Sequence, residues 1–350
     1  MTGSKYEISR RGFLATSASG VALLAASGGI GVARAESVTL TIATPGGNFG
    51  DAFNTAAFAP YAAKNPGIKI VLDSPDDPSK LRAMVDAGAV TWDLATTSSD
   101  FGLDEDAQWL EPIDYTVVDK NVFLPGFAST YRVGNTVEGI VIAYRTDVYG
   151  DKKPTSIADF FDIEKFPGKR GVQKYSPGGI LEWALVADGV DPKALYPLDV
   201  ERALKKLDTI KEEIVWWETG AQSAQLLTSN ETPMSFVWPG RGISAAESAP
   251  VAMCWDQWTH LGGFYVIPKG APNKDAAMKA LAYFTSAEAQ SRISTLLPYG
   301  AANKDAQVVD SPYAGNLTTE HFATGFDLDF TWWAKNREAV DVRFQEWLLI

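Results

Sequence analysis

The fold class is set by residues 37–72, which read SVTLTIATPGGNFGDAFNTAAFAPYAAKNPGIKIVL. Residues 37–43 are rich in strand-forming side chains and end at the turn-forming residues 44–47, so they predict a β-strand. Residues 52–64 have a helical pattern that ends at an Asn-Pro-Gly breaker. The alternation continues with a strand, a helix and a strand over 68–72, 79–88 and 92–96. Such alternation is typical of an α/β sheet with parallel pairing.

The same alternation returns after a strand predicted over residues 138–144. A helix over 200–212 is amphipathic, because Leu204, Leu207 and Ile210 fall on one face. The other elements expected in this half are strand 171–175, turn 176–179, helix 180–188, strand 214–217, helix 220–229, strand 234–238, strand 263–267 and helix 274–284. Extended segments rather than a flexible tether join the two halves, which predicts a hinge between them.

The first 35 residues predict an export signal that is not part of the fold. Residues 9–14 read SRRGFL, a twin-arginine motif, and an apolar stretch follows over 13–32. Residues 33–35, Ala-Arg-Ala, have the pattern of a signal-peptidase site, so we expect a mature chain that begins at Glu36 in the periplasm. A membrane anchor is the alternative, but serines and glycines dilute the apolar stretch.

Charge and cysteine content narrow the class of partner. Without residues 1–35 the chain has 27 basic and 42 acidic residues, which gives a net charge of −15. An acidic surface argues against nucleic acid as a partner. The one cysteine, Cys254, permits no internal disulfide, and with His260 and His321 it gives no metal-ligand spacing. We therefore expect a monomer without cofactor or metal.

No enzyme motif is present, because the sequence has no HExxH, no GxSxG and no P-loop. We therefore predict no catalytic residue. An envelope hydrolase remains the alternative from another class, since carboxylates far apart in sequence can meet in space. A ferric-type receptor is a smaller alternative, because the chain has many tyrosines but no adjacent Tyr-Tyr pair.

Four segments carry a family resemblance: WETGAQSAQLL at 217–227, FVWPGR at 236–241, FYVIPKGAPNKDAAMKALAYF at 264–284 and PYGAAN at 298–303. In this order they resemble the spermidine/putrescine-binding family of periplasmic receptors. The resemblance implies a two-lobed periplasmic-binding-protein fold of type II, in which each lobe is a mixed sheet flanked by helices and a hinge joins the lobes. It also implies lobe 1 from residues 36–140 plus 266–310 and lobe 2 from residues 141–265 plus 311–350. A solute that bridges the lobes would close the hinge, and the permease subunits of an ABC importer would read the closed form.

The resemblance also indicates ligand-binding residues. Trp238 matches the tryptophan that stacks on the ligand in this family, although a tryptophan at a strand end is often part of the core. Arg241, expected in a turn after that strand, has a guanidinium group that suits a carboxylate, and a surface salt bridge is its alternative role. Polyamine receptors hold ammonium groups with acids at two positions, where this chain has residues 175–179 and 261–263 without an acid.

Other candidates lie at strand ends and helix starts, where hydroxyl and backbone N–H groups are available to an anion. They are Thr44, Gly46, Ser98, Ser99, Tyr175, Ser176 and Trp217. The resemblance additionally implies Tyr299 as an aromatic contact. Helix capping is the alternative role of the hydroxyl groups. Asp256 is the best remaining acid for a ligand amine, or else a solvated charge at a strand end. We therefore predict the substrate-binding component of an ABC transporter, with a small carboxylate-bearing solute such as an organic acid or 4-aminobutyrate. Polyamine binding is the alternative.

Overall fold

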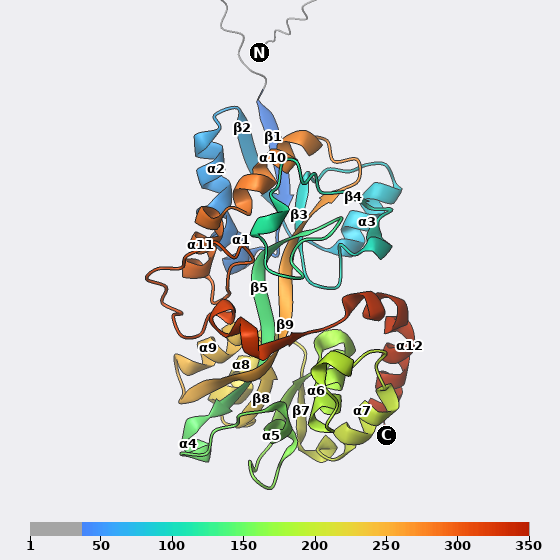
Figure 1. Ribbon diagram of the computed structural model, residues 1–350, viewed down its shortest axis with the longest axis vertical. Coiled ribbons are helices and arrows are strands. Elements are labelled where there is room, and N and C mark those ends of the chain that lie inside the picture. The colour runs from blue at the N-terminus through green and yellow to red at the C-terminus, as the bar shows by residue number, and fades with distance from the viewer. Residues whose placement is uncertain (1–36, 350) are drawn as a thin grey trace, which may run out of the picture. The chain divides into compact units, whose positions relative to one another are not determined.

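Two long antiparallel strands, β5 (Val133–Arg145) and β9 (Val251–Pro268), extend along the long axis of the molecule and connect its two groups of helices and strands (Figure 1). The structure, a computed structural model, describes residues 37–349, and the predicted export signal lies outside the described residues. The two strands pair over most of their length with two register shifts. Nearly every residue of β5 is buried, as is usual for a strand with structure on both faces.

The remaining strands extend this pair on both sides. They are β1 (Val38–Ala43), β2 (Ile68–Asp73), β3 (Leu94–Thr97), β4 (Leu110–Glu111), β6 (Arg170–Gln173), β7 (Ile214–Trp217), β8 (Met234–Val237) and β10 (Gly325–Asp327). The central order is β2-β1-β3-β9-β5-β8-β6-β7, and β4 and β10 also pair with β9. Pairing is parallel within β2-β1-β3 and within β8-β6-β7, and antiparallel where β9 and β5 join these groups. The predicted mixed α/β class is confirmed.

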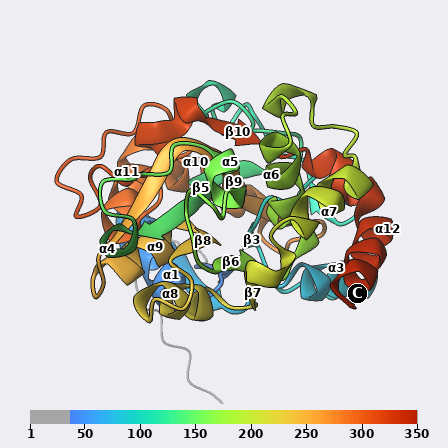
Figure 2. The same ribbon diagram turned by 90° about the horizontal axis from the view of Figure 1, so that it is seen from below.

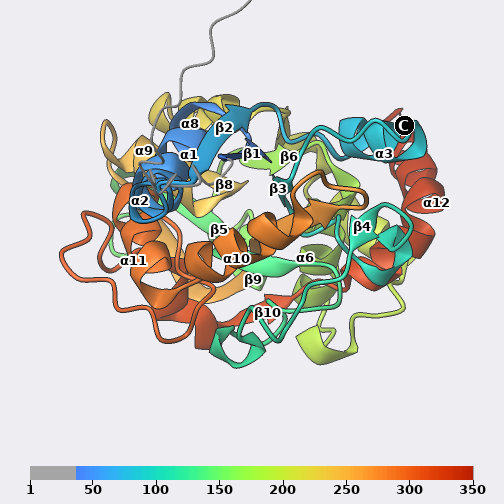
Figure 3. The same ribbon diagram turned by 90° about the horizontal axis from the view of Figure 1, so that it is seen from above.

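Helices cover the end of the sheet that holds β1, β2 and β3 (Figures 1 and 3). They are α1 (Gly47–Phe53), the π-helical turn η1 (Asn54–Phe58), α2 (Ala59–Lys64), α3 (Pro78–Asp86), α10 (Lys274–Phe284) and α11 (Ala287–Leu296), with short 3-10 turns η2 (Asp104–Asp106) and η3 (Lys120–Val122). Aromatic side chains pack these elements together. The ring centroids of Phe58 in η1 and Phe284 in α10 are 4.7 Å apart, and those of Phe53 in α1 and Tyr265 in β9 are 5.9 Å apart. Burial of such large side chains is the main stabilising contribution in this core.

A second set of helices surrounds β6, β7 and β8 (Figures 1 and 2). These are α4 (Thr146–Tyr149), α5 (Ile157–Phe161), η4 (Ser176–Gly178), α6 (Ile180–Ala187), η5 (Pro192–Ala194), α7 (Val200–Asp208), η6 (Lys211–Glu213), α8 (Gly220–Thr228), α9 (Pro239–Ala246), η7 (Thr318–Thr324) and α12 (Phe330–Leu349). The last helix, α12, buries Trp333, Phe344 and Trp347 in this second core. Glu182, fully buried on α6, accepts hydrogen bonds from Trp333 Nε1 at 2.7 Å and from the Tyr196 hydroxyl at 2.6 Å.

The structure differs from the sequence predictions in three places that affect the site. Arg241 lies in the first turn of helix α9 rather than in a strand turn. Asp256 lies in the middle of β9 rather than at a strand end. The helix predicted over 52–64 begins at Gly47, because Gly46 has a φ of 76° that turns the chain directly from β1 into α1. Helices α11 and α12 were not predicted.

Two further observations concern the chain as a whole. Within residues 37–349, no helix combines the length and the apolar character needed to cross a bilayer. Residues from Ser37 onward group as one compact unit, so the predicted division into lobes 36–140 plus 266–310 and 141–265 plus 311–350 stays a prediction.

Candidate functional site

Two adjoining cavities lie along β5 and β9. The first has a volume of about 320 Å³ and the second about 160 Å³. Both are lined by Ser98, which follows β3, and by Glu138 on β5. Because they share these side chains, we treat them as one cleft, with a first and a second cavity. The two together are of a size that suits a small metabolite rather than a polymer.

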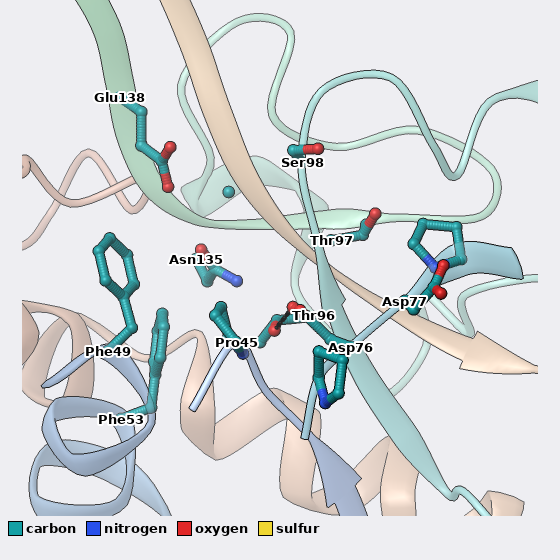
Figure 4. A pocket seen from close by; sticks show the side chains of 13 residues that line it. Pro45, Phe49, Phe53, Asp76, Asp77, Thr96, Thr97, Ser98, Asn135 and Glu138 are labelled. Atoms are coloured by element: carbon teal, nitrogen blue, oxygen red, sulfur yellow. Dashed lines mark hydrogen bonds between the residues drawn. The ribbon is translucent and has the colours of Figure 1, made fainter. Parts of the chain in front are cut away.

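The first cavity lies at the carboxyl ends of β1, β2 and β3, where parallel strands usually place ligand contacts (Figure 4). Phe49 and Phe53 of α1 form an apolar wall, and Asn135 and Glu138 of β5 face them. The rest of the lining is Pro45, Pro75, Asp76, Asp77, Pro78, Thr96, Thr97, Ser98 and Gly263. This cavity therefore combines an aromatic surface with carboxylates and hydroxyl groups.

Glu138 points into the cleft from the buried strand β5 (Figure 4). Burial and, to a smaller extent, the nearby Asp76 carboxylate raise the pKa of Glu138 to about 7, against the opposing effect of the hydrogen bond with Thr136. Gly263 on β9 leaves the space for this side chain, since a Cβ there would lie 2.9 Å from Glu138 Oε1. The cleft floor thus holds a carboxyl group poised to change charge near neutral pH.

Asp76 is the second carboxylate of the first cavity. It belongs to the loop between β2 and α3 and accepts a hydrogen bond from the Thr96 hydroxyl on β3. Burial raises the pKa of Asp76 above its ordinary value, and the Thr96 hydrogen bond opposes this rise. Among the described residues, neither Asp76 nor Glu138 forms an ion pair with a basic side chain.

The second cavity contains three of the predicted ligand-binding residues besides Ser98. Trp238, half-buried at the start of α9, lines it together with Tyr175 and Ser99. Trp217 does not line the cavity but is fully buried behind it, with its ring 5.3 Å from that of Trp238 in a T-shaped contact. Trp217 therefore packs against Trp238 from behind rather than facing the cleft.

Polar contacts cross the cleft beside the second cavity. Asp100, which follows β3, accepts a hydrogen bond from the Tyr175 hydroxyl at 3.2 Å and pairs with Arg337 of α12 at 3.2 Å. Lys335 of α12 pairs with Glu105 at 3.2 Å. Figures 2 and 3 show α12 on the same side of the molecule as α3, which agrees with these pairs. The C-terminal helix therefore links the second core to the loop after β3.

Arg241 and Tyr299 lie together next to Trp238. A Cβ at Gly220 would come 2.4 Å from Arg241 Nε and 3.1 Å from Trp238, so this glycine lets the guanidinium group pack there. The Arg241 side chain is exposed, and in the described chain it pairs with no carboxylate. Burial raises the pKa of Tyr299, the charge of Glu138 raises it further, and Arg241 opposes both. Both charges are thus close to the Tyr299 hydroxyl.

The hydroxyl groups of three predicted residues, Ser98, Ser99 and Thr44, form hydrogen bonds within the protein. The Ser99 hydroxyl accepts from Gly262 N at 2.8 Å, and Ser98 donates to Asp100 at 2.7 Å. Thr44 is buried, and its hydroxyl accepts from the backbone N–H of Gly46 at 3.3 Å, outside both cavities. These groups already have partners inside the protein.

Ser176 and Asp256 are not brought to the cavity linings. The buried Ser176 hydroxyl donates to Asp341 of α12, so it ties η4 to that helix. Asp256 is exposed and lines neither cavity. Glu138 and Asp76, which are among the acids that line the cleft, were missed. The signal for Glu138 was an acid inside a buried strand, and the signal for Asp76 was an acid three residues after a strand end.

The site has no arrangement typical of a metal centre. In the described part of the chain, no group of three or more His, Cys, Asp or Glu side chains is placed to hold a metal ion. The cavity linings contain neither histidine nor cysteine. The chemistry available to the cleft is therefore charge pairing, hydrogen bonding and stacking on aromatic rings.

Comparison with known proteins agrees with this description. Residues 56–317 match the family described as bacterial extracellular solute-binding protein. The chain is 33% identical over 331 residues to the gamma-aminobutyric acid-binding protein of Pseudomonas aeruginosa, covering 90% of this chain and 92% of that protein. A solved structure described as a GABA receptor has a TM-score of 0.82 and 38% identity, covering 89% of this chain and 98% of the other.

A more distant structure concerns the family suggested by the sequence motifs. The spermidine/putrescine substrate-binding protein PotD from Streptococcus pneumoniae has a TM-score of 0.70 at 16% identity, covering 89% of this chain and all of the other (100%), which shows a shared fold. The family model matches most of the chain, and the gamma-aminobutyric acid-binding relative matches nearly all of it. The chain therefore belongs to the bacterial extracellular solute-binding protein family.

Proposed function

We propose that this protein captures a small carboxylate-bearing solute, 4-aminobutyrate or a similar short amino acid, and delivers it to an ABC importer. The observation that carries the proposal is the position of Arg241 beside Trp238, which lines the second cavity, although Arg241 itself belongs to neither lining. An exposed guanidinium group without a protein carboxylate is available for bidentate pairing with a ligand carboxylate. The two relatives described as binding gamma-aminobutyric acid favour the same class of solute.

Transport would depend on movement about β5 and β9. Both strands connect the cores, and the register shifts near Gly134 and Ile140 interrupt their ladder. A solute that touches Arg241 on one side and the loop after β3 on the other stabilises the closed form by its higher affinity for that form. The monomeric, twin-arginine-exported protein would act in the periplasm, and permease subunits in the membrane would receive the closed complex.

Isothermal titration of the mature protein with 4-aminobutyrate, butyrate, putrescine and spermidine tests this function. We expect one-to-one binding of 4-aminobutyrate and about 100-fold weaker binding by Arg241→Ala, because the ligand carboxylate loses its charged partner. Arg343→Ala is the matched control, since Arg343 pairs with Glu201 away from the cleft and should leave the affinity unchanged. Tight polyamine binding with none for either carboxylate would overturn the proposal.

A polyamine ligand is the second candidate, favoured by one observation. The first cavity is lined by three carboxylates, those of Glu138, Asp76 and Asp77, and diamines are held by paired acids. Arg241 distinguishes the two ligands, because a cation next to the site weakens polyamine binding and strengthens carboxylate binding. Removing Arg241 should therefore have opposite effects on the two classes.

A further inference from the structure

Two of the three carboxylates that line the first cavity, Glu138 and Asp76, have few hydrogen-bond donors and no basic partner among the described residues. The Thr136 hydroxyl lies 3.0 Å from Glu138 Oε1 but also 2.9 Å from Asn135 Oδ1, and it has one proton to share. Asp76 accepts from the hydroxyl of Thr96 and from its own backbone N–H. A buried ionised carboxylate normally needs two or three donors or an opposite charge. Glu138 has less than one full donor, and no described basic side chain forms an ion pair with either carboxylate.

A third polar group in the same cavity also lacks a partner. Thr97 is 8% exposed and lines the first cavity, and its hydroxyl oxygen forms no hydrogen bond with the described residues. Buried hydroxyl groups are almost always paired, so an unpaired one beside a cavity indicates a ligand or water that completes it. The three polar groups lie on three different segments, at β3, at β5 and after β2.

The opposite wall of the cavity suits a cation as well. The rings of Phe49 and Phe53 stand 6.3 Å apart between centroids and face Asn135 and Glu138 across the cavity (Figure 4). Aromatic faces attract ammonium groups, most strongly where water is excluded. A carboxylate ligand would meet repulsion from two acids here. The charged end of a ligand in this cavity is therefore positive.

We infer that Glu138 and Asp76 form an ammonium subsite, with Thr97 and the Phe49–Phe53 wall completing it. The inference rests on the proposed function and makes the solute a zwitterion, with its ammonium group in the first cavity and its carboxylate at Arg241. The methylene chain between the two ends would lie along Trp238. An ammonium group has three donors, which is enough for both carboxylates and the Thr97 oxygen.

Titration calorimetry at pH 7.5 with 4-aminobutyrate, butyrate and putrescine tests the subsite in four proteins. These are the wild type, Glu138→Gln, Asp76→Asn and the control Asp256→Asn, whose carboxylate is exposed and outside both cavities. We expect Glu138→Gln to bind 4-aminobutyrate at least 100-fold more weakly and Asp76→Asn at least 10-fold more weakly. Butyrate affinity should stay within about threefold or increase, and Asp256→Asn should match the wild type. Circular dichroism confirms that each variant folds.

The outcomes separate the subsite from the proposed function. Wild-type affinity for 4-aminobutyrate in Glu138→Gln and Asp76→Asn overturns the subsite and leaves the function standing. If the wild type binds butyrate but neither 4-aminobutyrate nor putrescine, the subsite is likewise overturned and the carboxylate function stands. Binding of putrescine alone, lost in Glu138→Gln, overturns the carboxylate function and supports the subsite. A wild type that binds none of the three overturns both.

Discussion

Replacing Glu138 by glutamine should make the ligand-free protein more stable above pH 7, although it removes a ligand-binding group. Burial raises the pKa of Glu138 from 4.5 to about 7, so the folded protein keeps a proton that the unfolded chain has already released between these values. The free energy of unfolding therefore falls as the pH rises through this window and stays low above it. A glutamine has no proton to lose, so this penalty disappears.

The size of the effect follows from the pKa difference. The rise from 4.5 to about 7 corresponds to at most about 3 kcal/mol of differential stability. The side chain lines a cleft that solvent reaches, which reduces the expected gain for Glu138→Gln to about 1–2 kcal/mol. For a protein of this length, that gain raises Tm by about 2–4 °C. Below pH 4.5 the carboxyl group is protonated in both states, and the two proteins should be equally stable.

Thermal unfolding by circular dichroism at pH 4.5, 6, 7 and 8.5, without ligand, measures this difference. Asp256→Asn is the control, because its exposed carboxylate should give no gain at any pH. Asp76→Asn should act in the same direction as Glu138→Gln, since burial raises the pKa of Asp76 as well. A Tm gain that does not depend on pH, or a loss at pH 8.5, would refute the reasoning.

Three further substitutions probe packing and closure. Glu182→Leu should lower the free energy of unfolding by about 2–5 kcal/mol in urea titrations, because the Trp333 and Tyr196 donors lose their acceptor, whereas Glu182→Gln should cost less than half as much. Gly263→Ala should abolish solute binding in calorimetry, because its Cβ would come within 2.4 Å of two polar side chains on β5. Arg337→Ala should change Tm by less than about 2 °C, since this pair is exposed, but should increase the radius of gyration of the ligand-free protein in scattering.

Periodicity predicted most elements of the fold, because alternating strands and helices leave a local pattern in the sequence. The helix α12 was missed although its buried side chains, Trp333, Val340, Phe344 and Trp347, have helical spacing. The pairing of β9 with both β3 and β5 had no local signal, since it joins residues far apart in the chain.

Residues of the candidate site that belong to a sequence motif were predicted, whereas those that depend on contacts between distant strands were not. A sequence motif indicated both Trp238 and Arg241. In the structure Trp238 lines the second cavity, and Arg241 lies beside Trp238. Asp256 was singled out as an acid near the returning strand, but the alternation of side chains along β9 leaves it exposed outside the cavities. Glu138 enters the cleft only because Gly263 on the neighbouring strand leaves room, and that relation depends on strand register.

The position of β9 in the sheet has a consequence for synthesis of the chain. Until residues 251–268 leave the ribosome, the sheet exists only as two separate pieces, one ending at β3 and the other at β5. Each piece has an unpaired edge strand, and such edges favour aggregation. The second core is also incomplete until α12 supplies Trp333, Phe344 and Trp347. We therefore expect the two pieces to join into one sheet only after β9 has been synthesised, and the second core to close later still.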